Sequence, residues 1–586
     1  MRPLAPRSLV ALLATAALAL GSLGVAQTEP QRLLLLPFDA DDSVAALALA
    51  TPAALQRALN EIDGVYVGPI GDGAAALQRL VDAGDDDVLT HLAEAFGAQA
   101  VVLGRIVGSD ALALELVVVV DGAERTSRLE GRLDDLAGWW RLAAERIAAD
   151  AGLEVSSDDR SALRTVLGDA PSLPSLGPVG AASARLPGTR VDALASAAAL
   201  DAGSAWVRAE LARALALAGD RDQAIAVALE AVALSRTVEN LATLGVVQLV
   251  LGDAPAAAAT FEEALTHNPS HAIALVGLAQ TAAPADQALL LARAVAAAPR
   301  QIEAHLRLAA LQTSSAGAIQ TLRRAAERLP DSGSVLTALV DATLAAEDPR
   351  GALDLLRLAA ARPLGRTPVA YAVAVRLPQV VADGALGFVR EGIALFPGSA
   401  DLRRAEAELL RRAGDPAGAE AALRAAVEAD PTSVADVLAF ARVLAERGAG
   451  DEAQAVWATV ADQAADADLV RAELDLAAGR ARAALATLEP SVLAGEADVD
   501  RRTLYGIALG RIGRIDEARD VLTAVLDEAP DAELATRALA LLEERGRVAT
   551  DADLALSGEA AASFERGLGA LETGEFARAA EAFAAA

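Results

Sequence analysis

Small and large apolar residues recur at fixed offsets through the last two thirds of the chain. The clearest copy spans residues 239–269, with its repeat positions at Leu244, Gly245, Gly252, Ala257, Phe261, Ala264 and Pro269. Two further copies have the same offsets, at Gly506, Gly513, Ala518, Leu522, Val525, Pro530 and at Gly414, Ala419, Leu423, Ala426, Pro431. Because such self-similarity is typical of stacked supersecondary units, the pattern predicts a mostly α protein with a solenoid of helix pairs over residues 191–586.

The residue types at these offsets suit two helices that cross closely. Ala at a crossing point lets the backbones approach, and the large residue four positions later, such as Phe261, fills the groove between them. Gly252-Asp253 is typical of the turn within a pair, since Gly can end one helix and Asp can cap the next. Glu406 departs from the pattern, because it stands where a large apolar residue is usual.

Residues 27–152 follow a different pattern, in which strand-like and helix-like stretches alternate. Residues 33–38 form a short apolar run interrupted only by a proline, which favours a buried strand. Further strands are predicted at residues 65–70, 100–107, 112–120 and 126–133, and helices at residues 44–62, 74–83, 88–96 and 136–151. This mixture predicts a small α/β domain ahead of the repeats.

Residues 153–190 are rich in Pro, Gly and Ser, most densely over residues 171–178. Such a composition resists both helix and strand, so it predicts a linker. We therefore expect residues 27–150 to fold separately from the repeats.

Residues 1–26 have the organisation of a secretory signal peptide. A basic start precedes an apolar run over residues 9–20, and small residues at Gly24 and Ala26 lead to a cleavage site predicted before Gln27. The alternative is an uncleaved membrane anchor, although the run is short for a span. The pattern predicts a secreted or periplasmic protein with no integral membrane span after cleavage.

Composition narrows the classes of partner and chemistry. The formal net charge is -30, and all 51 basic residues are Arg. A protein that binds nucleic acid needs clustered cations to displace counterions, so the sequence predicts no nucleic-acid partner. The absence of Cys excludes disulfides and thiolate chemistry, and the absence of Lys excludes a phosphate-binding loop that ends in Lys-Ser or Lys-Thr.

No stretch carries a recognisable catalytic or metal-binding motif. His267 and His271 have a helical metal-binding spacing, but Pro269 lies between them, which favours two polar turn residues. The Asp clusters at residues 39–42 and 85–87 lack the glycine and distal Glu of a calcium loop, which favours helix capping and solvated charge. No Gly-x-Ser-x-Gly nucleophile motif occurs. We predict no enzyme activity, no cofactor and no metal.

Trp139 and Trp140 are conspicuous because aromatic residues make up only 3% of the chain. Adjacent residues of a helix point in different directions. One Trp is therefore expected in the core and the other half-buried, with an exposed aromatic anchor for a partner as the alternative.

The repeat offsets resemble those of the tetratricopeptide repeat family, whose paired antiparallel helices have small residues where they cross. This resemblance covers residues 191–586 and implies an extended curved surface that holds other molecules. Residues 31–150 resemble the amino-terminal α/β domain of TolB-like and CsgG-like bacterial envelope proteins, through the run 33–38 and the later segment 98–104. That second resemblance implies a binding or assembly module.

The leading hypothesis is a non-enzymatic extracytoplasmic scaffold that binds protein or peptide partners on the concave face of the solenoid. The family's groove-facing first helix points to Arg213, Arg404, Glu408 and Arg411 as partner-binding residues. The alternative is a cell-envelope enzyme or regulatory module with its site in the α/β domain. A deep pocket with convergent carboxylates in that domain would favour the enzyme.

The last residues begin one more repeat, with Gly574, Ala579 and Phe583 at the expected offsets. A solenoid usually ends in a capping element with a polar outer face, and the closing Ala-rich stretch supplies none. We therefore expect the natural chain to continue past Ala586, or the last unit to fray or pair with another molecule.

Overall fold

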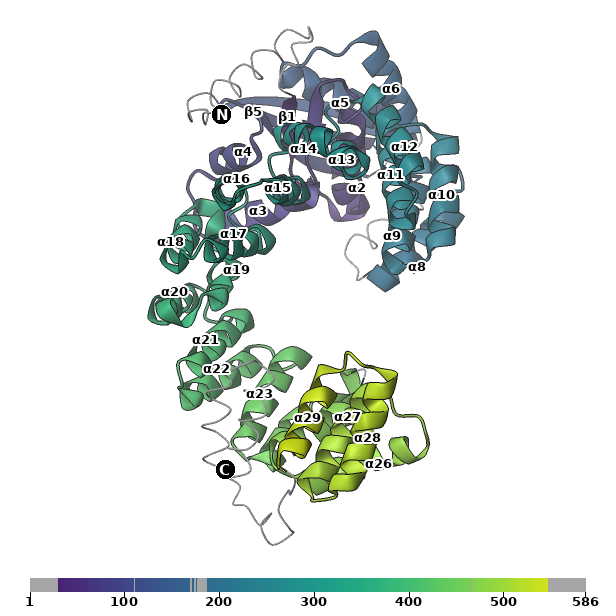
Figure 1. Ribbon diagram of the computed structural model, residues 1–586. Coiled ribbons are helices and arrows are strands. Elements are labelled where there is room, and N and C mark those ends of the chain that lie inside the picture. Colours follow the sequence, from purple (N-terminus) through teal and green to yellow (C-terminus); the bar gives the residue numbers. More distant parts are fainter. Residues whose placement is uncertain are drawn as a thin grey trace, which may run out of the picture. The chain divides into compact units, whose positions relative to one another are not determined.

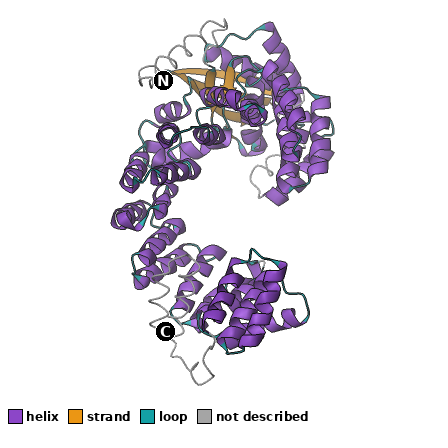
Figure 2. Cartoon of the chain, viewed as in Figure 1, coloured by secondary structure: helices purple, strands orange, loops and turns teal. Residues whose placement is uncertain are grey.

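The computed structural model describes residues 30–109, 111–168, 171–172, 175, 187–464 and 466–545. The predicted signal peptide, part of the Pro-rich segment and the last predicted repeat lie outside the described residues. The chain forms two compact units: unit 1 is residues 1–348 with 357–366, and unit 2 is residues 349–356 with 367–586. Helices dominate both units, and the described strands all lie in unit 1 (Figure 2).

Unit 1 begins with a mixed sheet, which confirms the predicted α/β layer. Its strands are β1 (Gln31–Leu35), β2 (Asp39–Ala40), β3 (Val65–Val67), β4 (Ala100–Gly108), β5 (Ala111–Val120) and β6 (Ala123–Arg132). The strand order is β3-β1-β4-β5-β6, with β2 added to β4. β1 is parallel to both neighbours, whereas β4, β5 and β6 are antiparallel. Only the two-residue strand β2 was not predicted.

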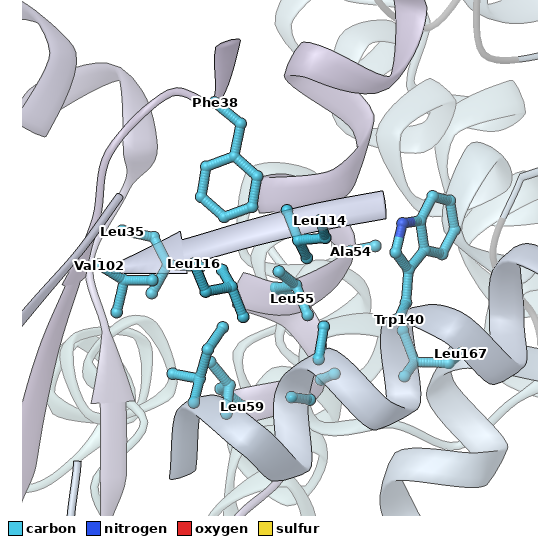
Figure 3. Close-up of a cluster of buried hydrophobic side chains, with 14 of the residues drawn as sticks. Leu35, Phe38, Ala54, Leu55, Leu59, Val102, Leu114, Leu116, Trp140 and Leu167 are labelled. Atoms are coloured by element: carbon cyan, nitrogen blue, oxygen red, sulfur yellow. The ribbon is translucent and has the colours of Figure 1, made fainter. Parts of the chain in front are cut away.

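Helices cover both faces of this sheet. On one face lie α2 (Ala46–Leu59), α5 (Leu136–Asp150) and α6 (Ser157–Gly168), and on the other lie α3 (Ile70–Asp82) and α4 (Val88–Phe96). Leu35 of β1 packs against α2 on the first face (Figure 3), whereas Leu34 packs with α3 and α4 on the second. The last three residues of β1, Leu33 to Leu35, are therefore buried on both sides of the sheet, which is why they form a continuous apolar run.

The expectation of a linker over residues 153–190 is wrong for α6. This helix lies inside that segment, and its Leu163, Val166 and Leu167 are buried in the core of the sheet. Residues 71–73, which lie between the predicted strand over 65–70 and the predicted helix over 74–83, likewise belong to α3. In both places a stretch that contains Gly or Ser is followed by apolar residues that pack on the sheet. This packing outweighs the low helix propensity of the local composition.

The expectation of one half-buried Trp is also wrong. Trp139 and Trp140 are 1% and 0% exposed. α5 lies against both β6 and α2, so adjacent residues of α5 can pack against different elements. Trp139 packs on Gly131 and donates its indole N–H to the Leu129 carbonyl at 3.1 Å, whereas Trp140 donates to the Thr51 hydroxyl at 3.1 Å.

The repeats form the predicted helix pairs, which confirms a tetratricopeptide-type solenoid. In unit 1 their helices are α8 (Pro187–Leu200), α9 (Ala205–Ala218), α10 (Arg221–Leu234), α11 (Val238–Leu251), α12 (Ala254–His267), α13 (Ala272–Thr281), α14 (Pro284–Ala297), α15 (Ile302–Ala310), α16 (Ser315–Arg328) and α17 (Gly333–Ala345). α18 (Pro349–Ala360) and the 3-10 turn η3 (Pro363–Gly365) follow. The clearest copy turns as predicted: Gly252 has φ +85°, and the Asp253 carboxylate accepts from the Ala256 N–H at 3.1 Å.

Unit 2 continues the pattern after an irregular start. Its elements are α19 (Pro368–Ala372), η4 (Val373–Arg376), η5 (Gln379–Val381), α20 (Ala382–Leu395), α21 (Ala400–Arg412), α22 (Pro416–Ala429), α23 (Val434–Glu446), α24 (Gly450–Trp457), η6 (Ala461–Gln463), α25 (Ala467–Ala477), α26 (Ala481–Leu493), α27 (Val499–Arg511), α28 (Ile515–Glu528) and α29 (Glu533–Arg545). Glu406 is buried despite its charge, because Arg390 and Arg403 donate to its carboxylate at 2.9 and 3.3 Å. None of the helices described in either unit combines the length and the apolar run needed to span a bilayer.

Candidate functional site

Within unit 1 the α/β domain lies beside the repeats (Figure 1), and it is docked against the amino-terminal ends of α11 and α13. The contact is polar and buried. We call it the docking interface, and it comprises Arg57, Asn60, Glu61, Glu239, Asn240, Asn268 and His271. The α/β domain and the first repeats thus belong to one compact unit, and separate folding of residues 27–150 stays a prediction.

Glu61 follows α2 and caps a repeat helix. Its Oε1 accepts from the Val238 N–H, at the start of α11, at 2.8 Å. An anionic side chain at a helix amino terminus is favourable, because the first N–H groups have no partner within the helix. Glu61 is nevertheless 8% exposed, and burial raises the pKa of its carboxyl to about 7. The neighbouring Glu239 raises this pKa further, whereas Arg57 lowers it.

Glu239 and Arg57 complete the charged part of the docking interface. Burial raises the pKa of Glu239, but the nearby His271 and Arg57 outweigh this, so its pKa lies well below the ordinary value. The His271 Nε2 lies 3.3 Å from Glu239 Oε1. Arg57 donates to Asn240 Oδ1 at 2.7 Å, and its guanidinium lies 5.4 Å from the ring centroid of Trp206 in α9. The anion Glu239 is thus held between cationic or polar groups from both partners.

Asn268, in the loop between α12 and α13, ties the repeats to the edge of the sheet. Its side-chain amide donates to the Asn60 carbonyl at 2.6 Å and to the Val65 carbonyl of β3 at 3.1 Å. Asn268 is 1% exposed, so these bonds satisfy backbone groups that water does not reach.

A second group of contacts joins α4 and β1 to later repeats. The Arg32 guanidinium donates to the Gly97 carbonyl at 2.6 Å and to the Ala296 carbonyl of α14 at 2.7 Å. Arg300 lies over the Phe96 ring at 4.8 Å and donates to both oxygens of Asp331 at 2.8 and 2.9 Å. The α/β domain is therefore held at two places along the repeats.

Arg213 lies on α9, and its guanidinium is already engaged within the repeats. It donates to the Thr243 hydroxyl of α11 at 2.9 Å and pairs with Glu210 at 3.4 Å. Glu210 raises the pKa of Arg213, burial opposes this, and Glu239 raises it further. Arg213 thus supports the first repeats next to the docking interface.

Arg404, Glu408 and Arg411 share α21 of unit 2, one to two turns apart. Arg404 donates to Asp401 at 2.7 Å and to Asp436 of α23 at 2.6 Å. Arg411 makes a two-pronged contact with Glu408 at 2.9 and 3.0 Å. Burial raises the pKa of Glu408, but the hydrogen bonds from Arg411 outweigh it and the pKa lies below its ordinary value. The three side chains stay 41%, 31% and 47% exposed.

Ion pairs also join successive first helices further along unit 2. Arg442 of α23 lies 2.7 Å from Glu473 of α25, and Arg501 of α27 lies 2.7 Å from Asp466, which caps α25. The first helices therefore present paired charges of both signs. Such a face is suited to polar recognition of protein or peptide.

The sequence pattern does not predict the docking interface. Of the two histidines with a helical metal-binding spacing, His267 and His271, only His271 belongs to the docking interface, where its Nδ1 accepts from the Ala274 N–H at the start of α13. In the described part of the chain, no three His, Asp or Glu side chains gather closely enough to hold a metal ion. Asn268, next to Pro269, was the available sequence signal for the docking interface, since the side chain of a loop Asn often hydrogen-bonds backbone groups.

A cavity of about 310 Å³ lies beside α4, at the end of α16 and at η3. His91 lines it and pairs with Asp85 at 2.7 Å, an arrangement that could orient a general base. The other lining residues are Glu94, Ala95, Glu327, Arg328, Pro330, Arg362, Pro363 and Leu364. None of these carries a hydroxyl that the imidazole could activate.

No family model matches the chain, and no curated protein matches it. Several solved structures are similar to it. A tetratricopeptide repeat protein from Parabacteroides merdae is 17% identical, over 39% of this chain and 92% of that one, with a TM-score of 0.29. Yeast Tom70 is 14% identical, over 64% and 96%, with a TM-score of 0.28. The pilF protein of Pseudomonas aeruginosa is 18% identical, over 35% and 97%, with a TM-score of 0.26.

Proposed function

We propose that the chain is a non-enzymatic extracytoplasmic scaffold that holds protein or peptide partners on the first-helix face of its repeats. One observation carries the proposal: the repeats of unit 1 already hold a folded domain, their own α/β domain, through hydrogen bonds at and just before the amino-terminal ends of their first helices. The extracytoplasmic location rests on the signal-peptide pattern of residues 1–26, and the TolB-like or CsgG-like character of the α/β domain rests on its sequence.

The proposed partner surface is α21 with the neighbouring α23. Arg404, Glu408 and Arg411 are fixed by ion pairs yet remain partly exposed, so a partner can bind them without first ordering long side chains. Because the paired charges have both signs, the surface fits a partner segment that itself carries Asp or Glu next to Arg or Lys.

The alternative, an envelope enzyme or regulatory module, is supported only by the His91–Asp85 pair beside the cavity. A catalytic role needs a nucleophile or an activated water near that imidazole. We favour the scaffold, because the repeats already hold a whole folded domain through the contacts of the docking interface.

Site-specific photo-crosslinking tests the proposal. A photoreactive residue at Glu408 should capture a partner from an envelope extract, whereas one at Glu428, exposed on the second helix α22, should not. Glu408→Arg should abolish capture by a photoreactive residue at Arg411, and Glu428→Arg should leave it unchanged. Equal capture from both positions would contradict the first-helix assignment. Amino-terminal sequencing of the secreted chain should begin at Gln27, which tests the location separately.

A further inference from the structure

We propose that the chain self-associates through β6, whose outer edge pairs antiparallel with β6 of a second copy and joins two sheets into one. The proposal goes beyond the scaffold function, since it concerns the α/β domain and not the first-helix face of the repeats.

The two edges of the sheet differ in how their backbone groups are satisfied. At the β3 edge, Asn60 Oδ1 accepts from the Val67 N–H at 2.7 Å, and the Asn268 amide donates to the Val65 carbonyl at 3.1 Å. Side chains therefore cap this short edge strand. β6 is ten residues long and pairs with β5 along its whole length, from Ala123 opposite Val120 to Arg132 opposite Ala111.

The turn between β5 and β6 shows which backbone groups of β6 face outward. Asp121 and Gly122 both have positive φ, +50° and +76°, as in a two-residue hairpin turn. The pair that closes such a turn, Val120 with Ala123, is hydrogen-bonded, and hydrogen-bonded positions alternate along an antiparallel ladder. Odd-numbered residues of β6 thus bond to β5. Glu124, Thr126 and Arg128 direct their N–H and C=O groups to the outer edge, where no backbone bond from a described residue meets them.

The charges on β6 select one register for a pair of copies. With Thr126 opposite the Thr126 of a second copy, Glu124 of each strand lies opposite Arg128 of the other. A slide of the second strand by two residues either way, the smallest step that keeps the outward-facing residues opposite one another, places Glu124 opposite Glu130, or Arg125 opposite Arg125. Like charges directly opposite each other are unfavourable in a sheet. Only the first of these three registers is free of such a clash.

The surroundings of these side chains agree with this register. Glu124 is exposed and has no partner among the described residues, whereas Arg128 is held on the same face by Glu115 at 2.6 Å and Glu130 at 2.8 Å. Charges on an edge strand normally prevent unspecific pairing. Here the charges of one β6 strand are complementary to those of a second β6 strand related by a two-fold axis. They therefore favour pairing with a second copy of this strand and disfavour pairing with other strands.

Sedimentation of the full chain over a range of concentrations tests the proposal. We expect a reversible monomer–dimer equilibrium, weakened at least tenfold by Glu124→Arg. The matched control Glu154→Arg makes the same change of charge at another exposed position of unit 1 and should leave the equilibrium unchanged. A chain that stays monomeric up to about 100 µM, or a dimer equally stable in Glu124→Arg, would overturn the proposal.

A second measurement uses the absence of Cys from the chain. In the proposed register the two Thr126 Cα atoms lie about 5.5 Å apart, a separation that a disulfide can bridge. Thr126→Cys should therefore form a covalent dimer on mild oxidation, whereas Thr165→Cys, exposed on α6, should not. Failure of Thr126→Cys to cross-link in a folded protein, shown by an unchanged circular-dichroism melt, would overturn this register.

Discussion

Glu61 shows how a single buried carboxylate can make the docking of a domain depend on pH. Its folded pKa of about 7 lies above the ordinary value of 4.5. The folded state therefore binds the proton more tightly than the unfolded state. The resulting stabilisation is complete below about pH 4.5 and is lost as the pH rises through 7.

Glu61→Gln should remove this dependence while keeping an oxygen that accepts from the Val238 N–H. Relative to the wild type, we expect Glu61→Gln to gain stability as the pH is raised from 5 to 8, by up to about 3 kcal/mol in the free energy of unfolding of unit 1. Thermal melts at several pH values measure the difference. Glu428→Gln is the exposed control, and its stability should follow that of the wild type at every pH. Parallel curves for Glu61→Gln as well would show that Glu61 does not titrate in this range.

Arg412 shows what residue-level reasoning from the sequence could not give. The sequence alone suggests one more exposed arginine of α21, whose replacement would be expected to have little effect. In the structure its guanidinium donates to Glu408 at 2.8 Å and to the Val375 carbonyl of η4 at 2.7 Å. We therefore expect Arg412→Ala to destabilise unit 2 by about 1–2 kcal/mol, because a charged hydrogen bond to the backbone is lost. Arg519→Ala, whose exposed pair with Asp516 lies within one helix, is the control and should change the melt little.

At the scale of elements, the repeat pattern predicted the helix pairs because the residues that carry it are the ones that pack. Phe261 lies between α11 and α13, and a Cβ atom added at Gly245 or Gly277 would approach its ring to 2.5 or 2.2 Å. Ala257 and Ala264 of the same helix are fully buried. These contacts are local in sequence, so their spacing reveals them.

Gly277→Ala should therefore destabilise unit 1, by about 1–3 kcal/mol, since the Phe261 ring is enclosed and cannot move away. Gly71→Ala is the matched control within unit 1. It lies in α3 with no atom within 4 Å of the added Cβ, so it should be neutral or stabilising by up to about 1 kcal/mol. Chemical denaturation of the two variants measures the contrast, and equal effects would mean that the Phe261 contact does not limit packing.

At the scale of the whole molecule, composition predicts a boundary between the α/β domain and the repeats. In the structure, contacts between residues far apart in the sequence join these parts into unit 1. Asn60 and Asn268 are 208 positions apart, and Arg57 and Asn240 are 183 apart. No periodicity links such pairs, and each residue alone reads as an ordinary polar surface position. The helix pairs and most strands could therefore be predicted, but the docking interface could not.

Asn268→Ala tests whether the α/β domain and the first repeats unfold together. The substitution leaves the Asn60 and Val65 carbonyls without the buried amide that they bind, at a cost of about 1–3 kcal/mol. If the two parts are one cooperative unit, hydrogen exchange should accelerate in α2 and the central strands as much as in α11 to α13, because all these amides then exchange through the same opening. Thr266→Ala, exposed on α12, should leave both regions unchanged. Faster exchange confined to the α12–α13 loop would instead mean that the α/β domain folds independently and only contacts the repeats.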